Sequence, residues 1–143
     1  MAFRRYNPKR VAISFAGLQL VGFMDGTFAA FQMDEDQVMR TVGADGFGVA
    51  TLNANLGATV KITLIQASPS NDSLSALLPD PINGRLPTGE FQIKDLNGTT
   101  LLHAKDAYIV RVPNVDYAKE VGPREWTFQL DSVDTYLVGG SDE

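Results

Sequence analysis

Residues 91–112, FQIKDLNGTTLLHAKDAYIVRV, form the stretch that decides the fold class. Apolar and polar residues alternate from Phe91 onward, and such alternation is typical of a strand with one buried face. Asn97-Gly98 follows, a strong hairpin signal because both residues tolerate the positive φ of a type I′ turn. The stretch therefore predicts an antiparallel hairpin. The apolar residues expected along one face are Phe91, Ile93, Leu102, Ala104, Tyr108, Val110 and Val112.

The same alternation recurs on both sides of this hairpin. Residues 59–64 and 126–131 each alternate between polar and apolar, so both stretches predict half-buried strands. Residues 11–15 alternate as well and begin a strand pair that turns at Ala16-Gly17. The chain is therefore dominated by strands.

One segment departs from the period of two. Ser68 can cap a helix whose first position is Pro69, and Asp72 complements the dipole of the first turn. Pro79 ends the segment, because the residue before a proline avoids the α region. The pattern predicts one α-helix over about residues 69–78. The leucines that share its apolar face are Leu74, Leu77 and Leu78.

These elements together predict a mainly β fold. We expect two antiparallel sheets forming a sandwich or a flattened barrel with one short α-helix. With 143 residues, 44% hydrophobic and 20% charged, the chain suits a single domain over residues 1–143 with a real core. A basic N-terminal arm, residues 1–10, and an acidic tail, residues 139–143, flank the strand pattern.

Composition excludes several classes of protein. The chain contains no cysteine, which rules out thiol nucleophiles, disulfide frameworks, zinc ribbons and iron–sulfur clusters. Its 12 basic against 17 acidic residues leave a formal charge of −5. This balance argues against a dedicated duplex-DNA binder, which needs clustered Lys and Arg facing the phosphates.

The N-terminus carries a second interpretation. Four cations precede an apolar stretch over residues 11–23, and this order resembles a secretory signal. Ser14, Gly17 and Gln19 interrupt the stretch, which is also too short to span a bilayer. We therefore expect a basic arm followed by strands, in a protein that is neither exported nor membrane-bound.

Residues that could carry chemistry are few. His103 is the only histidine, and nothing near it marks a nucleophile or an orienting acid, so an exposed strand position is expected. The acidic run at residues 34–36 lacks the alternating oxygens and the glycine of a calcium loop, which favours a solvated loop tip. The sequence therefore predicts no catalytic residue, no metal site and no cofactor.

Two features predict a binding partner instead. The stretch 34–56 is rich in Gly, Ala and Asn, and a long hairpin there would project and leave unpaired sheet edges, which proteins either protect or use for assembly. The basic arm is the second feature, since screened charge pairs are weak singly but add up when they repeat between copies. The assembly contacts expected between the arm and a neighbouring subunit are Arg4, Arg5, Lys9 and Arg10 on one side and Asp34, Glu35 and Asp36, or the acidic tail, on the other.

Several turns and strand ends, taken as a set, resemble those of the tail tube proteins of contractile-tailed bacteriophages. They run in the same order from about residue 25 to residue 130, whereas the first 24 residues match nothing comparable. The stretches are 25–28 (DGTF), 42–46 (VGADG), 68–72 (SPSND) with 74–77, 94–100 (KDLNGTT), 120–121 (EV) and 124–126 (REW).

The resemblance implies a virion structural protein with no catalytic residues. It implies a subunit that forms hexameric rings, stacked into a tube inside a contractile sheath, with sheath, baseplate and tail terminator proteins as partners. DNA would pass through without specific binding, which agrees with the acidic balance. The location implied is the virion tail, after assembly in the host cytoplasm. The alternative is a monomeric β-barrel module that binds a small ligand or a sugar, which would need a concave pocket; an enzyme ranks third.

Overall fold

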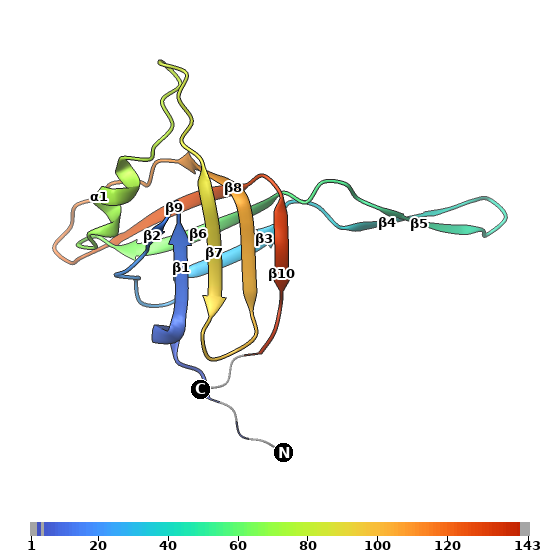
Figure 1. Cartoon of the computed structure of the whole chain (residues 1–143), viewed down its shortest axis with the longest axis horizontal. Helices are drawn as coiled ribbons and strands as arrows, with labels where there is room; N and C mark the ends of the chain where they lie inside the picture. The colour runs from blue at the N-terminus through green and yellow to red at the C-terminus, as the bar shows by residue number, and fades with distance from the viewer. Residues whose placement is uncertain (1–2, 4, 141–143) are drawn as a thin grey trace.

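The computed structural model describes residue 3 and residues 5–140, and these residues form mainly β-strands around one short helix (Figure 1). All strand pairings are antiparallel, so the predicted fold class is confirmed. In chain order the elements are a 3-10 turn η1 (Pro8–Arg10), β1 (Val11–Phe15), β2 (Leu18–Gln19), β3 (Ala29–Met33), β4 (Val38–Val42), β5 (Gly48–Leu52), β6 (Ala58–Ile65), α1 (Ser70–Ser75), β7 (Gly89–Asp95), β8 (Leu101–Arg111), β9 (Pro123–Leu130) and β10 (Val133–Leu137).

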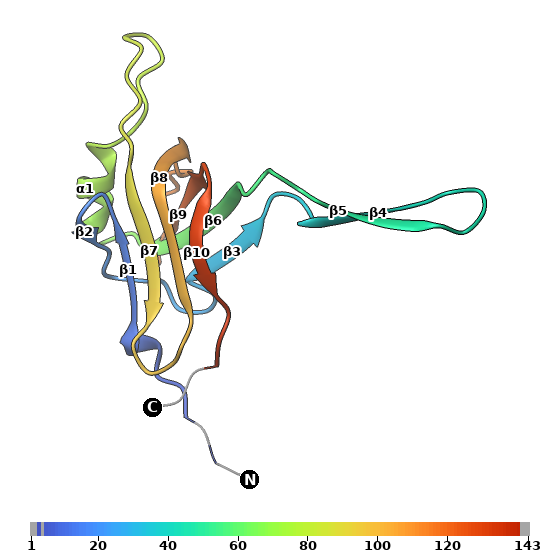
Figure 2. The same cartoon turned by 45° about the vertical axis from the view of Figure 1, so that its right-hand side comes forward.

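One large sheet folds over itself to make both layers of a sandwich. Its strand order is β2-β1-β7-β8-β9-β6-β3, with β10 paired to β8 as well. The first part of β8, from Leu101 to Ala104, pairs with β10, whereas the part from Ala107 to Arg111 pairs with β9. Figures 1 and 2 show β1, β7 and β10 in one layer, with β9, β6 and β3 crossing behind them. Strand β8 therefore belongs to both layers.

A bulge in β8 overturns part of the expected apolar face. Phe91 pairs with Ala104, but Gly89, two residues earlier in β7, pairs with Ala107, three residues further along β8. The extra residue shifts the alternation by one position, so the buried residues after the bulge are Ala107 and Ile109. The prediction that Tyr108, Val110 and Val112 continue the buried face of Leu102 is wrong; Val110 and Val112 are 48% and 58% exposed.

The turn at Asn97-Gly98 also differs from the prediction. Lys94 is the last β7 residue paired with β8, opposite Leu101, and neither residue of the dipeptide has positive φ. The connection is a longer loop in which the Asp95 carboxylate accepts a hydrogen bond from the Asn97 N–H at 3.0 Å. Gly98 is needed for space rather than for φ, because a Cβ there would overlap the Gly140 carbonyl oxygen.

The turn predicted at Ala16-Gly17 is confirmed. Phe15 pairs with Leu18 across it, and Ala16 and Gly17 have φ of 52° and 82°. Positive φ at both central residues matches the right-handed twist of the flanking strands. This turn gives the tightest hairpin of the sandwich.

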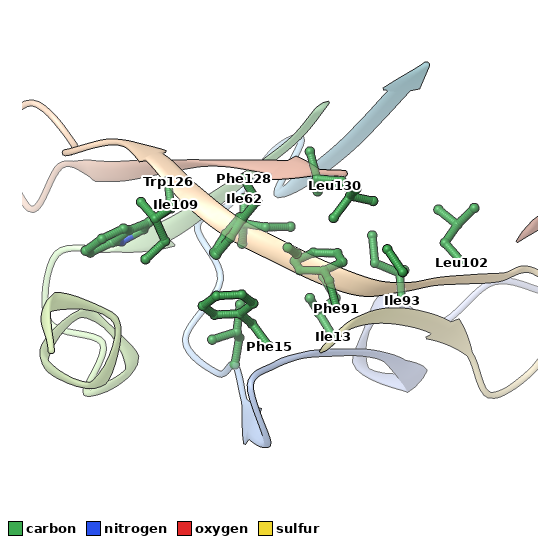
Figure 3. Packing of buried hydrophobic residues seen from close by; sticks show 14 of the residues in the cluster. Ile13, Phe15, Ile62, Phe91, Ile93, Leu102, Ile109, Trp126, Phe128 and Leu130 are labelled. Carbon is green, nitrogen blue, oxygen red and sulfur yellow. The ribbon is translucent and has the colours of Figure 1, made fainter. Parts of the chain in front are cut away.

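Three phenylalanine rings join the two layers at the centre of the core (Figure 3). Phe128 of β9 lies 5.0 Å from Phe15 of β1 and 5.2 Å from Phe91 of β7, measured between ring centroids. All three side chains are fully buried. Other buried members of the cluster include Ile13, Val60, Ile62, Leu64, Leu102, Ile109, Trp126 and Leu130, so the strands predicted at 59–64 and 126–131 are confirmed.

Helix α1 covers one side of the core and is shorter than expected. It spans Ser70–Ser75, and Pro69 occupies the position before the first helical residue. Ser68 Oγ accepts a hydrogen bond from the Ser70 N–H at 3.2 Å. Of the three predicted leucines, Leu74 is fully buried, while Leu77 and Leu78 pack against the core in part. The Asn71 side chain accepts a hydrogen bond from Trp126 Nε1 at 2.9 Å, which ties the helix to β9.

We expect Phe128→Ala to lower the free energy of unfolding by about 3–5 kcal/mol, because it removes the ring that both layers share and leaves a cavity. Urea denaturation followed by circular dichroism measures this change. The matched control is Phe47→Ala, since the Phe47 ring is 71% exposed, and its effect should stay within about 0.5 kcal/mol. Equal losses in both variants would contradict the assignment of the core.

Candidate functional site

A two-stranded ribbon extends away from the sandwich (Figures 1 and 2). It carries exposed apolar side chains. Strands β4 and β5 pair with each other and with no other strand of the described chain, and all ten of their residues are exposed. Phe47, in the turn between them, is 71% exposed, and Leu52 is 81% exposed. A lone hairpin is at best marginally stable in water. The projecting hairpin predicted at residues 34–56 is present as β4, β5 and the turn between them.

Both faces of the ribbon are partly apolar. Val38 lies opposite Leu52, and Thr41 lies opposite Val49. Because the side chains of successive residues point to opposite faces, these two pairs lie on different faces of the ribbon. The ribbon can therefore be covered from both sides.

Hydrogen bonds from three strands hold the base of the ribbon. The Asp34 carboxylate accepts hydrogen bonds from the Thr59 hydroxyl of β6 and from Gln129 Nε2 of β9, both at 2.8 Å. Tyr136 of β10 donates its hydroxyl proton to Gln37 Oε1 at 2.6 Å. These contacts attach the ribbon to both layers, so the sandwich sets its direction.

The acidic run at residues 34–36 lies at this base, and the prediction of a loop tip is wrong. The tip is the turn over residues 43–47, where the Phe47 N–H donates to the Asp45 carboxylate at 3.2 Å. Glu35 accepts a hydrogen bond from Asn53 Nδ2, which also donates to the Asp36 carbonyl oxygen, each at 2.9 Å. The sequence pattern could not predict this position, because the residues that bond Asp34, namely Thr59 and Gln129, lie far along the chain.

The basic arm lies elsewhere on the molecule. Arg4 falls outside the described residues, and Arg5 is exposed. Lys9 and Arg10 belong to η1, where Arg10 Nε donates to the Asn97 side-chain oxygen at 3.1 Å. Within the subunit, the structure therefore places Lys9 and Arg10 at loop 96–100 and not at the acidic run.

The C-terminal segment reaches the same loop as the arm. The Thr100 hydroxyl donates to the Gly139 carbonyl oxygen at 2.7 Å, and the Thr99 N–H donates to the Gly140 carbonyl oxygen at 3.2 Å. Residues 141–143 of the acidic tail fall outside the described residues. Loop 96–100 thus holds both the arm and the end of the described chain.

His103 lies on the outer face of β8 between two carboxylates. Its ring nitrogens are 3.8 Å from Glu90 Oε2 and 3.8 Å from Asp134 Oδ2. The Asp134 carboxylate also accepts a hydrogen bond from the Lys105 N–H at 2.9 Å, within the bulged part of β8. The predicted strand position is confirmed, but the His103 side chain is 30% exposed and therefore half-buried rather than exposed.

Metal-binding clusters and membrane-spanning helices are both absent from residues 3 and 5–140. No cluster of three or more His, Cys, Asp or Glu side chains among residues 3 and 5–140 could hold a metal ion. No helix in the same part of the chain has the length and apolar character needed to cross a membrane.

The family of this protein follows from its similarity to a known family of phage proteins. The family model of the bacteriophage PhiTE tail tube protein matches residues 21–138. The chain belongs to this family of phage tail tube proteins. The tail tube protein is thus a structural protein and not an enzyme, and the family implies assembly with other copies and other tail proteins. The predicted resemblance, which began at about residue 25, is confirmed.

Two relatives agree with this assignment. Structural protein ORF10 of Pseudomonas phage KPP10 is 29% identical over 144 residues, which cover 95% of this chain and 83% of the relative. The tube-terminating cap of the anti-feeding prophage, solved by electron cryo-microscopy, superposes with a TM-score of 0.60 at 10% identity, over 99% of this chain and 95% of the cap chain. At that identity the second similarity concerns the fold alone.

The sequence pattern missed one further projection. The loop after α1, residues 79–88, extends from the sandwich in a direction different from that of the ribbon (Figure 1). Ile82 at its end is 94% exposed. The one sequence signal for this projection is an apolar residue, Ile82, between Pro81 and Asn83. A loop rich in Pro, Gly and Asn is normally solvated, so the sequence alone did not predict a surface feature there.

We expect Asp34→Ala to loosen the ribbon while the sandwich stays folded. The change removes the acceptor of two hydrogen bonds, and a typical hydrogen bond contributes about 1 kcal/mol net to stability. Hydrogen exchange over residues 34–57 should therefore become faster, with unchanged protection in β7 and β9. Asp36→Ala is the control, because the Asp36 contact with Asn53 uses the backbone carbonyl. Equal exchange in the two variants would contradict the anchoring role of Asp34.

Proposed function

We propose that this tail tube protein assembles as hexameric rings that stack into the DNA-conducting channel inside a contractile sheath. The observation that carries the proposal is the ribbon β4–β5, which leaves apolar side chains uncovered on both faces in a chain of the tail tube family. A neighbouring subunit that covers the ribbon would bury this surface. Burial of apolar area is the main favourable contribution to most protein association.

Ring closure follows from the physics of identical subunits. A contact between two different patches of identical copies generates a ring when the rotation closes and an open helical stack when it does not. Strands β2 and β3 end the strand order of the large sheet, so each has one edge available for pairing. A tube needs both kinds of contact, one within each ring and one between rings.

The charge of the chain suits a channel for DNA. A formal charge of −5 provides no strong attraction for phosphates, so DNA would pass without specific binding. The partners proposed with it are the sheath around the tube, the baseplate at one end and the tail terminator at the other. The place of assembly proposed is the host cytoplasm, and the final location is the virion tail.

Electron microscopy of the purified protein tests the proposal directly. We expect rings or tubes at high concentration, and Val38→Ser/Phe47→Ser/Leu52→Ser should abolish them, because the variant removes exposed apolar side chains while leaving the core intact. The control Val112→Ser/Val115→Ser/Val121→Ser changes three other exposed residues and should still assemble. A wild-type protein that stays monomeric across salt and concentration would favour the monomeric ligand-binding module instead.

The basic arm is proposed as an additional contact between copies. In this proposal Arg4, Arg5, Lys9 and Arg10 of one subunit meet the acidic ribbon base (Asp34, Glu35 and Asp36) of a neighbour. The position of that run favours it, because a copy that binds the ribbon also approaches its base. Such pairs are exposed and screened, with a Debye length of about 10 Å at 0.1 M salt.

Replacing Arg4, Arg5 and Lys9 with Ser should therefore reduce ring stacking while the subunit stays folded, because the proposed contacts between copies are lost. Arg10 is retained because it bonds Asn97 within the subunit. Light scattering at low and high salt measures the effect, and high salt should reduce the stacking of the wild type in part. The control replaces Lys61, Arg111 and Lys119 with Ser. If the arm variant stacks as well as wild type at every ionic strength, the arm takes no part in assembly.

A further inference from the structure

The loop between α1 and β7 is ordered into a narrow finger. Asp80 and Arg85 exchange two backbone hydrogen bonds, of 2.8 and 2.9 Å. The Asp80 carboxylate accepts hydrogen bonds from the side chain and the N–H of Asn83, and these bonds lower the pKa of Asp80. Gly84, with φ of 68°, completes the turn. These bonds close residues 80–85 into a turn, and the finger, residues 79–88, presents Ile82 at its exposed end.

Ile82 is an unusual residue to present in this way. Its side chain is 94% exposed, and Leu86 on the same finger is 53% exposed. The Arg85 side chain lies beside them, 3.8 Å from the Asp80 carboxylate. The finger thus offers an apolar tip flanked by one cation and one anion.

A groove with the matching character lies beside η1. Its volume is about 580 Å³, and it lies between the arm and the segment that leads from β2 to β3. Tyr6, Phe23, Met24 and Phe28 provide its apolar surface, while Lys9 and Asp25 provide one cation and one anion. A second hollow of about 430 Å³ continues from it along Tyr6 and Phe28 toward Phe31. The groove therefore has room for a branched aliphatic side chain.

The finger and the η1 side of the groove lie at opposite ends of the molecule. Both views show the finger at one end of the sandwich and η1, which borders the groove, at the other (Figures 1 and 2). The finger of a subunit therefore cannot reach its own groove. A second copy placed head to tail can, because the two surfaces are then adjacent.

We infer that the finger of one subunit docks in the groove of the next copy, with Ile82 against Tyr6 and Phe28. In this contact Arg85 faces Asp25 of the neighbour, so a cation meets an anion. The finger points crosswise to the ribbon (Figure 1). The two projections therefore serve different contacts, which is what an assembly with neighbours in two directions requires. The inference rests on the proposed tube and names one of its contacts.

Cross-linking between two variants tests the contact without requiring a finished tube. The chain has no cysteine, so single cysteines are introduced as Leu86→Cys in one copy and Met24→Cys in another. The mixed variants are treated with a short bifunctional maleimide and analysed by mass spectrometry. We expect a cross-linked heterodimer joined through residues 86 and 24. The control pair, Leu86→Cys with Val110→Cys, should give a yield at least about tenfold lower, because Val110 is exposed on β8 and lines neither the groove nor the second hollow.

Substitutions in the finger then test the chemistry of the contact. Ile82→Asp in the Leu86→Cys copy places a charge in an apolar groove and should lower the yield at least about tenfold. Arg85→Glu should lower it as well, and Asp25→Lys in the partner copy should restore it by reversing the charge pair. A yield equal to that of the control pair, or one unaffected by Ile82→Asp, would overturn the inference.

Imaging separates this inference from the proposed function. Ile82→Asp lies on an exposed side chain, so the subunit should fold normally and fail to form tubes. Tubes from this variant would overturn the finger contact and leave the tube function standing. Specific cross-links between the Leu86→Cys and Met24→Cys copies, together with a wild-type protein that never forms rings or tubes, would support the finger contact and contradict the tube function.

Discussion

The bend in β8 is the constraint on which the rest of the structure depends. This strand pairs with β7 from Leu101 to Ala107 and passes from β10 to β9 along its other edge, so it must change direction where the bulge lies. This bend folds a single sheet into two layers and brings Phe128 against Phe15 and Phe91. Without it, the sheet would expose the apolar face that these rings fill.

The position of the ribbon depends on the same bend, because the bend brings together the strands that hold the ribbon base. Its base is held by Thr59 of β6, Gln129 of β9 and Tyr136 of β10, and β10 lies in the other layer of the sandwich from β6 and β9. Only a closed sandwich places these groups around Asp34 and Gln37. Folding of the core therefore determines where the ribbon points, although no residue of β4 or β5 is buried.

The distribution of apolar residues separates folding from assembly. The core uses short runs from many strands, whereas the ribbon and the finger carry large side chains such as Leu52 and Ile82 in contact with solvent. Exposed apolar area of this kind is typical of protein–protein contacts. A small sandwich with two such projections is suited to a repeated assembly, in agreement with its membership of a tail tube family.

Local patterns determined the strands at 59–64 and 126–131, the turn at Ala16-Gly17, the helix near Leu74 and the projecting hairpin, because each depends on residues close in the chain. Tertiary structure alone decided the face of Val110, since a bulge shifts the alternation without leaving a sequence signal. It also decided the anchoring of Asp34 by Gln129, 95 positions away, and the placing of the finger and the η1 side of the groove at opposite ends. These features arise from contacts between distant residues, and a period of two or a turn dipeptide carries no information about such contacts.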